Sequence, residues 1–452
     1  MTLTPNTVEY AIQHLLRVAL PGEDGFVKEM IMNDDHLQLH CAYDILIDME
    51  LLTDDEKGQL LAHQLKSCPL PSAPDAPAFQ PARCQGLPEL DVAERHLHIR
   101  LDLVTPTFLF LSRIEETQTD KRDNHGRFRY RDSLAYHYHC IDIPVVDVYA
   151  MFLRKALIEA GFPQEQIHPR KGRLIPTHDI DHLQRFTSRW QAMKSIFGRD
   201  LLLTRKPRVV KESLREYREW RQDPCRDPYI TAIQELLVLE KDLPSVFFFL
   251  AQTKEDGNVA YDITGKEAAE ALRMVKDAGK TIGLHGSYDS YNDSDRLIRE
   301  TNLLEQSAGQ AITSARQHYL RYEAGTDICL HSLKGWLASH RTDDYTLGYA
   351  EYAGFRCGTC HPYPLYDLYN DCPSTCIEHP LILMDGTLFD YMRLSFQDCQ
   401  AILQKLYDNC MAVEGDFVML WHNHLLRREY YPHFKNLYQP FIRQHLTNTP
   451  NL

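Results

Sequence analysis

The chain has 452 residues, of which 44% are hydrophobic and 25% charged, and it carries a net charge of −14 at pH 7. These are ordinary values for a globular protein, and the length allows two or three domains. The negative charge argues against a general nucleic-acid binder, whose binding surface would be basic. Every apolar run is much shorter than the roughly 18 residues of a membrane span, so no transmembrane segment is expected.

The first 25 residues have the pattern of a short amphipathic helix that ends at Pro21-Gly22. They lack the charged start and long apolar core of a signal peptide, which predicts a cytoplasmic protein. The twelve cysteines are scattered rather than arranged as a disulfide framework, and this also favours a reducing compartment.

The pattern up to residue 165 is mixed. Residues 68–83 contain five prolines and are expected to be irregular. The apolar runs 96–103 and 107–112 predict strands, and 145–161 predicts an amphipathic helix with a glycine stop. We therefore expect an amino-terminal accessory domain over 1–165, of the α/β or α+β class and of unknown role, that ends in the polar, proline-containing stretch before residue 174.

From residue 166 to 452 the pattern becomes regular, with amphipathic helices alternating with short apolar strands. Strands are expected around 173–176, 245–250, 281–284 and 417–421, and helices at 229–243, 265–278 and 395–413. Alternation of this kind is typical of a parallel sheet. The expected fold class is therefore α/β.

Polar clusters follow three of the expected strands: "THDIDH" at 177–182, "HGSYD" at 285–289 and "HNH" at 422–424. Active sites of α/β barrels lie at the carboxyl ends of the strands. On an extended segment Asp179 and Asp181 share one face. Two carboxylates on one face repel each other unless a cation or a shared proton lies between them. The pattern indicates a metal site or an acid/base pair, and the alternative is a surface turn.

The residue types suit metal-assisted hydrolysis. Asp181 and His285 are suitable zinc ligands, and a catalytic zinc keeps one position open for water. Asp179 would lie beside that water as a base. His422 could protonate a leaving group from the opposite side.

Four cysteines, at 357, 360, 372 and 376, have the spacing C-x2-C-x11-C-x3-C. This spacing is close to that of a zinc ribbon but outside its usual range. We expect buried or partly buried free thiols there rather than a structural zinc.

The order of these motifs resembles the NodB-like polysaccharide deacetylases, carbohydrate esterase family 4, over residues 172–425. The segments that carry the resemblance are "THDID", "SVFFFL", "GLHGSYD", "RQHY" and "LWHN". Two further segments, "GYAEYAGFRCGTCHPY" and "LILMDGTLFDY", are similar to a bacterial subgroup with an extra amino-terminal domain. The resemblance implies a distorted (β/α) barrel for residues 166–452.

The resemblance also implies roles for individual residues. Asp179 would be the catalytic base, oriented by Arg316, with Arg321 as a less favoured substitute. His422 would be the general acid. Asp181 and His285 would bind Zn²⁺ or another divalent cation.

Two positions depart from the family pattern. Asp289 stands where the family has the second histidine of its His-x3-His motif, and His318 stands where it has a proline. We favour His318 as the third metal ligand over Asp289 or a site without a third ligand. Asp385 either pairs with His422 or lies in an exposed turn.

The implied activity is removal of an acetyl group from a carbohydrate in surface-polysaccharide biosynthesis. The substrate would be an acetylated amino sugar, or less often an O-acetyl sugar, on an intermediate made inside the cell and linked to a nucleotide or a lipid. Two alternatives remain: a degenerate barrel that binds glycans without turnover, and a metal-independent C–N hydrolase of the same superfamily. The sequence leaves the oligomeric state open.

Residues 204–224 carry seven Lys or Arg against three Glu. As a helix this segment would place Lys211, Arg215 and Arg218 on one stripe. We expect a solvated, salt-bridged face or, alternatively, peripheral contact with an anionic sugar carrier or the inner membrane surface.

Overall fold

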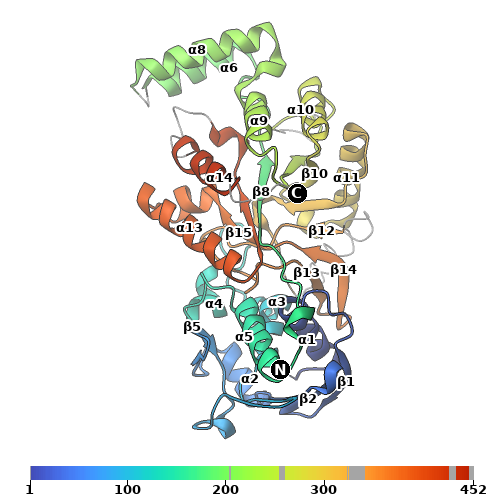
Figure 1. The fold of residues 1–452 in the computed structure, drawn as a ribbon. Coiled ribbons are helices and arrows are strands. Elements are labelled where there is room, and N and C mark those ends of the chain that lie inside the picture. Colours follow the sequence, from blue (N-terminus) through green and yellow to red (C-terminus); the bar gives the residue numbers. More distant parts are fainter. Residues whose placement is uncertain are drawn as a thin grey trace.

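Two β-sheets from different parts of the sequence organise the chain (Figure 1). The computed structural model describes residues 2–202, 205–253, 260–322, 324, 342–426 and 434–446. Strands between residues 27 and 99 form a five-stranded sheet, and strands between 173 and 420 form a nine-stranded sheet. The α/β class expected for residues 166–452 is confirmed.

The smaller sheet has the strand order β1-β2-β3-β7-β6, with β3 and β7 parallel and the other pairs antiparallel. Helices α1, α3 and α5 contact one another and lie between this sheet and the rest of the chain (Figure 1). The elements of this part are α1 Pro5–Ala19, β1 Val27–Met32, β2 His36–Cys41, β3 Leu46–Glu50, α2 Asp54–Leu61, β4 Cys68–Leu70, β5 Ala73–Ala78, β6 Leu90–Ala93, β7 His96–Ile99, α3 Val104–Ser112, α4 Leu134–His137 and α5 Val145–Glu159.

The larger sheet has the order β13-β14-β12-β11-β10-β9-β8-β16-β15, and only the β13–β14 pair among its ladders is antiparallel. Its strands are β8 Arg173–Ile180, β9 Val246–Leu250, β10 Thr281–Gly286, β11 Ser314–Gln317, β12 Asp343–Asp344, β13 Tyr363–Asp367, β14 Cys372–Glu378, β15 Leu381–Met384 and β16 Asp416–Leu420. The helices that accompany it are α6 Arg189–Met193, α8 Pro207–Gln222, α9 Pro228–Leu239, α10 Lys266–Asp277, α11 Ser294–Ala308, α13 Phe396–Ala412 and α14 Gln439–Leu446.

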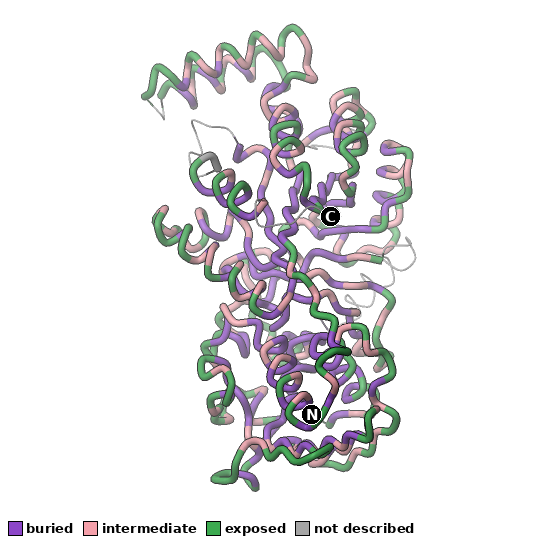
Figure 2. Tube along the Cα trace, viewed as in Figure 1, coloured by how far each residue is buried: buried purple, intermediate pink, exposed green. Residues whose placement is uncertain are grey.

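The larger sheet curls around a small apolar core of its own. Alternate residues of its strands, among them Ile175, Phe248 and Val418, pack together on the inner face. The residues between them, such as Phe247 and Phe417, belong to the main core beneath the helices. Figure 2 shows the buried strands enclosed by helices whose outer sides are exposed. The curl brings the carboxyl ends of separate strands around one hollow, which is where a site can form.

Two sequence predictions for the amino-terminal part are wrong. Residues 107–112 are helical in α3 rather than a strand, because Asp102 accepts hydrogen bonds from the backbone N–H groups of Val104 and Thr105 and starts a helix that is buried on all sides. In a short run of consecutive apolar residues, the spacing of the apolar positions cannot distinguish a helix from a strand. The proline-rich segment is also partly regular, since β4 and β5 pair antiparallel with Pro69 opposite Pro77. A two-stranded ladder tolerates proline because both of its strands are edges.

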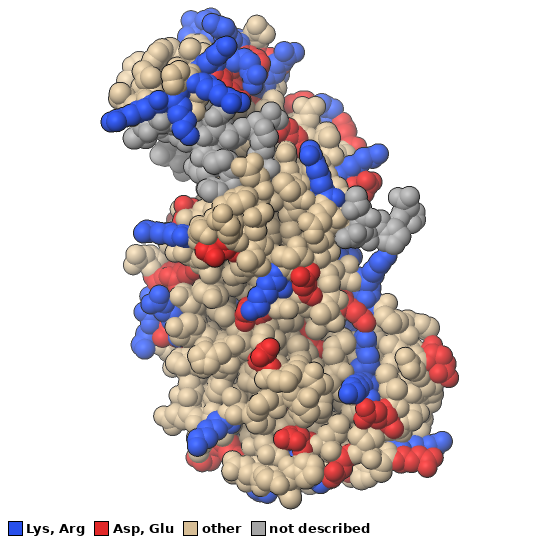
Figure 3. Space-filling view, turned by 60° about the vertical axis from the view of Figure 1, so that its left-hand side comes forward, with Lys and Arg blue, Asp and Glu red and all other residues tan. Residues whose placement is uncertain are grey.

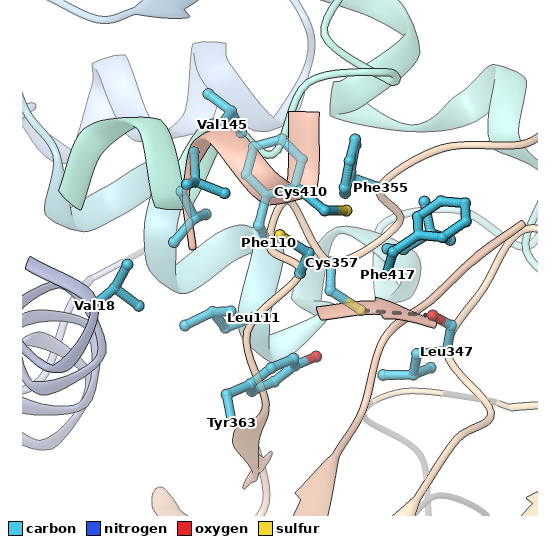
Figure 4. Close-up of a cluster of buried hydrophobic side chains, with 14 of the residues drawn as sticks. Val18, Phe110, Leu111, Val145, Leu347, Phe355, Cys357, Tyr363, Cys410 and Phe417 are labelled. Carbon is cyan, nitrogen blue, oxygen red and sulfur yellow. Dashed lines mark hydrogen bonds between the residues drawn. The ribbon is translucent and has the colours of Figure 1, made fainter. Parts of the chain in front are cut away.

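The two parts of the chain share one hydrophobic core. Val18, Phe110 and Val145 from the first part belong to the same buried cluster as Leu347, Phe355 and Phe417 of the second. Figure 4 shows Phe110 close to Cys357 and Cys410 of the second part. The division at residue 165 stays a prediction.

The cysteine group does not form a metal site in the described part of the chain. Cys357, Cys360 and Cys376 are buried and Cys372 is exposed. Cys357 lies among apolar side chains, with its sulfur 3.9 Å from the carbonyl oxygen of Leu347 (Figure 4). All four are free thiols; three are buried as predicted, but the prediction of burial is wrong for Cys372.

A buried ion network joins the two parts of the chain. The carboxylate of Glu116 accepts hydrogen bonds from Arg356 Nε at 2.9 Å and Nη2 at 2.8 Å, and from Arg113 Nε at 2.9 Å. All three side chains are at most 2% exposed. Burial would raise the pKa of Glu116, but the charges of Arg356 and Arg113 outweigh it and lower the pKa below its usual value.

We expect Glu116→Gln to lower the free energy of unfolding by about 3–5 kcal/mol, because it leaves two guanidinium groups buried with less negative charge between them. Urea denaturation measures the change. Glu159→Gln is the matched control, because Glu159 is half exposed and pairs with Lys155 only at 4.0 Å. Equal stability of the two variants would show that the network contributes little.

Candidate metal centre

Strand β8 positions the two carboxylates by its alternation. It is an inner strand of the sheet, paired with β9 and β16. Asp179 points into the hollow of the sheet, and Asp181, just beyond the strand, follows it. His178 points the other way, where its ring nitrogens lie 2.7 Å from the Trp421 carbonyl oxygen and 3.0 Å from Glu240 Oε2. The predicted alternation of side chains along β8 thus places His178 on the opposite face from Asp179 and Asp181, where it has a structural role.

Arg316, on β11, holds Asp179 from the neighbouring side. Its Nη1 donates to Asp179 Oδ1 at 2.9 Å and to the Thr177 hydroxyl at 2.8 Å, and its Nε donates to the Tyr345 carbonyl oxygen at 2.9 Å. Burial would raise the pKa of Asp179, but the charges of His285 and Arg316 keep it below its usual value. The carboxylate is therefore both oriented and ionised. The substitute residue, Arg321, bonds the carbonyl oxygen of Tyr288 instead.

Asp181, His285 and His318 form a cluster whose ligand atoms all lie within 4.8 Å of one another. His285 Nε2 is 3.2 Å from Asp181 Oδ1, and His318 Nε2 is 3.6 Å from the same oxygen. His285 Nδ1 donates to the Arg316 carbonyl oxygen at 3.0 Å, and this bond aims Nε2 at the carboxylates.

Two buried atoms of this cluster face each other without a well-formed hydrogen bond. Asp181 Oδ1 and His285 Nε2 lie 3.2 Å apart, but among the described residues neither has a hydrogen-bond partner of good geometry. Buried polar atoms are normally satisfied, and a cation between the three side chains would satisfy both. One carboxylate and two imidazoles are a common ligand set of catalytic zinc. The residues therefore fit a divalent cation.

The electrostatics of the cluster agree with that fit. Burial, reinforced by the positive charge of His285, lowers the pKa of His318 to about 4, so its imidazole is neutral and can act as a ligand. Burial would lower the pKa of His285, but Asp179 and Asp181 outweigh it and raise the pKa. The negative potential that favours a proton on His285 would favour a metal cation in its place.

Asp289, the alternative third ligand, lies outside the cluster. Its side chain is 72% exposed, and its nearest cationic partners are Arg296 at 3.8 Å and Arg321 at 3.9 Å. After β10 the chain turns and enters a short 3₁₀ helix, Ser290–Asn292, with Asp289 at the surface. His318 lines the cavity from the start of the short helical turn His318–Leu320, which directly follows β11.

His422 follows β16 and also lines the cavity. Its Nδ1 is 2.8 Å from Asp385 Oδ1, and its backbone N–H donates to Asp385 Oδ2 at 2.7 Å. Asp385 is fully buried, so it pairs with His422 and is not an exposed turn residue. Burial would lower the pKa of His422, but Asp385 outweighs it and raises the pKa to about 10. His422 Nε2, 3.5 Å from Asp181 Oδ2, therefore carries a proton at neutral pH.

These side chains open into a cavity of about 280 Å³, and one wall of it comes from the amino-terminal part of the chain. Arg127 lines the cavity and donates to the Tyr319 carbonyl oxygen at 2.9 Å and to the Tyr391 hydroxyl at 3.2 Å. Asp123 anchors its Nε at 2.7 Å, and the ring of His125 lies 4.4 Å from that of Tyr319.

Through its hydrogen bond to the Tyr319 carbonyl oxygen, Arg127 stabilises the turn that carries His318. Tyr319 adopts a left-handed backbone conformation with φ of 59°, which is unfavourable for a side-chain-bearing residue unless its surroundings hold it. The sequence did not indicate this contact, because local pattern does not tell which distant segment a loop will touch.

In comparison with known proteins, one family model matches the first part of the chain. A sequence family of unknown function, DUF7033, matches residues 5–162. No curated protein matches the chain.

Several solved structures are similar to the chain over about three fifths of its length. A protein described as a polysaccharide deacetylase from Mycobacterium smegmatis is 17% identical with a TM-score of 0.37, covering 62% of this chain and 85% of its own. Another so described, from Pseudomonas aeruginosa PAO1, is 13% identical with a TM-score of 0.35, covering 61% and 84%. A CE4 family pseudoenzyme from Bacillus anthracis is 11% identical with a TM-score of 0.30, covering 62% and 63%.

We expect His318→Ala to lose bound zinc, while Asp289→Ala keeps it, because only His318 reaches the cluster. Both proteins are stripped of metal, and the dissociation constant for Zn²⁺ is measured by competition with a chelator. Full zinc affinity in His318→Ala combined with loss in Asp289→Ala would contradict this assignment.

We expect Arg127→Ala to weaken zinc binding by about 10- to 100-fold, as is typical when a residue that positions a metal ligand is removed. The same competition measurement applies. Lys121→Ala is the control, because Lys121 lies on the same loop with 66% of its side chain exposed. If both variants bind zinc like the unmodified protein, Arg127 does not position His318.

Proposed function

We propose that the protein is a metal-dependent hydrolase that removes an acetyl group from a carbohydrate. The observation that supports this most directly is the joint placement of three groups around one cavity. These are the ligand cluster of Asp181, His285 and His318, the oriented carboxylate of Asp179, and the protonated imidazole of His422. Metal-assisted hydrolysis of an amide uses a Lewis acid, a general base and a general acid.

In the proposed reaction, water attacks the acetyl carbonyl carbon and the C–N bond breaks. A bound Zn²⁺ or other divalent cation supplies Lewis acidity, polarising the carbonyl and making the water more acidic. Asp179, fixed by Arg316, takes the proton from the attacking water. His422 Nε2 gives its proton to the departing amine, so acetate and the free amino sugar are released.

The two catalytic groups suit these opposite roles because their environments push their pKa values apart. The pKa of Asp179 is lowered by His285 and Arg316 against its burial, so it is ready to accept a proton. The pKa of His422 is raised to about 10, with burial opposed by Asp385, so it holds a proton to donate. Paired groups with separated pKa values are the usual arrangement for acid and base in one site.

The proposed substrate is an N-acetylated amino sugar on an intermediate of surface-polysaccharide assembly, linked to a nucleotide or a lipid. The support for this class is the resemblance of the strand-end motifs to the NodB-like deacetylases. Among the described residues, no helix is both long and apolar enough to cross a membrane.

A glycan-binding protein without turnover is the second candidate. The observation that favours it is the exposed position of Asp289, which leaves the second family motif with one ligand. Zinc binding without acetate release would support this candidate, and acetate release without metal would indicate a metal-independent amidase.

We expect the zinc-loaded protein to release acetate from N-acetylated oligosaccharides and to lose this activity with EDTA. Asp179→Asn should keep its zinc affinity within a few-fold but lose about 10²- to 10⁴-fold in kcat, because a general base contributes that much. Acetate release and zinc content are measured on the same samples. Near-normal turnover in Asp179→Asn would exclude it as the base, and the exposed Asp289→Asn serves as the matched control.

A further inference from the structure

A helical hairpin projects from the molecule between β8 and β9. Its first arm is α6, which continues through residues 194–201, and its second arm is α8 (Figure 1). We refer to residues 189–202 and 205–222 as the basic hairpin. The predicted helix in this region is therefore present, and Lys211, Arg215 and Arg218 are all exposed along it.

The inner faces of the two arms are occupied by each other. Phe186, Ala192 and Ile196 form a small buried core covered by α8 side chains, which are Val210, Leu214, Tyr217 and Trp220. At its base, Arg185 donates to Asp200 at 2.5 Å and also to Glu216. The hairpin is thus a unit with a small apolar core of its own.

The outer surface of the hairpin is strongly basic in an acidic protein. Between residues 189 and 222 the sequence has ten Lys or Arg and four Asp or Glu, whereas the whole chain has a net charge of −14. Figure 3 shows the Lys and Arg side chains gathered at the hairpin end of the molecule. The exposed basic residues of α8 and its start are Arg205, Lys206, Arg208, Lys211, Arg215, Arg218 and Arg221.

Large apolar side chains are exposed on the same hairpin. The exposed fractions are 74% for Trp190, 68% for Leu202, 48% for Phe197 and 42% for Leu201. Lys194 lies over the Trp190 ring at 5.3 Å. Exposed apolar groups that cluster are usually part of a binding surface. Tryptophan, phenylalanine and leucine beside lysine and arginine are typical of helices that lie at the surface of an anionic bilayer.

The hairpin stands at the same end of the sheet as the cavity. It begins a few residues after Asp181, and a cleft between α8 and α9 is lined by Arg215, Tyr229 and Asn423. Asn423 directly follows His422, the proposed acid. A surface bound by the hairpin would therefore lie near the entrance to the site.

We infer that the basic hairpin docks the protein on an anionic phospholipid bilayer. Its lysines and arginines contact lipid phosphates, and Trp190, Phe197, Leu201 and Leu202 enter the headgroup region. Charge complementarity selects this occupant, because the surface is a local positive patch on a negative protein. The inference rests on the hairpin alone and stands whether or not the proposed deacetylase activity is found.

The test is sedimentation of the full chain with vesicles of phosphatidylcholine alone and with about one third phosphatidylglycerol. We expect binding only to the anionic vesicles, weakened by salt. Lys211→Glu/Arg215→Glu/Arg218→Glu should reduce the partition coefficient at least tenfold. Trp190→Ala/Leu202→Ala should also reduce it, by loss of apolar contact.

The matched control is Arg95→Glu/Lys155→Glu/Arg273→Glu, which makes the same change of net charge at side chains that are 57%, 69% and 58% exposed elsewhere. It should bind vesicles like the unmodified protein. If the hairpin charge reversal does not fold, as judged by melting temperature and zinc content, Lys211→Gln/Arg215→Gln/Arg218→Gln replaces it and should also weaken binding.

Three results would overturn the inference: no preference for anionic vesicles, equal loss in the control, or unchanged binding in the hairpin variants. The inference would also be overturned if duplex DNA bound as tightly as anionic vesicles or more tightly. The hairpin would then be a binding surface for a soluble polyanion rather than for a bilayer.

Discussion

The site depends on the placement of two carboxylates, Asp179 and Asp181, two residues apart at the end of a buried strand. Strand alternation points both into the same hollow, where neither can be left with its charge uncompensated. Arg316 compensates Asp179 at 2.9 Å, and the imidazoles of His285 and His318 surround Asp181. Asp179 is thus held by a fixed guanidinium group, whereas Asp181 remains open to a metal. This difference between the two carboxylates is the physical basis of the proposed chemistry.

His318, and not Asp289, lies with Asp181 and His285 in the candidate metal cluster. The segment after β10 carries Asp289 to the surface. His318 reaches the cluster from the end of the next strand, because β10 and β11 are parallel neighbours and end at the same edge of the sheet. Side chains that follow β10 and side chains that follow β11 can therefore reach the same space at this edge of the sheet.

The amino-terminal part of the chain belongs to the site as well as to the core. Glu116 and Arg356 join it to the larger part through a buried ion pair, and Arg127 reaches from it to the turn that bears His318. A rigid junction matters here because the cavity wall comes from both parts. Displacement at the junction would move Arg127 and the carbonyl oxygen of Tyr319 that it holds.

The sequence by itself determined the α/β class of residues 166–452, the strand-end positions of Asp179, Asp181, His285 and His422, and the shared face of the two carboxylates. These follow from periodicities of two and of 3.6 residues, which act over short distances along the chain. Only the tertiary structure placed His318 rather than Asp289 beside Asp181 and His285, paired Asp385 with His422, and brought Arg127 to the cavity. Each of these depends on which side chains meet after strands and loops far apart in sequence have packed, and local pattern carries no information about such meetings. The same reason explains the error at residues 107–112, where burial on all sides removed the periodic signal and the capping bonds of Asp102 determined the helix.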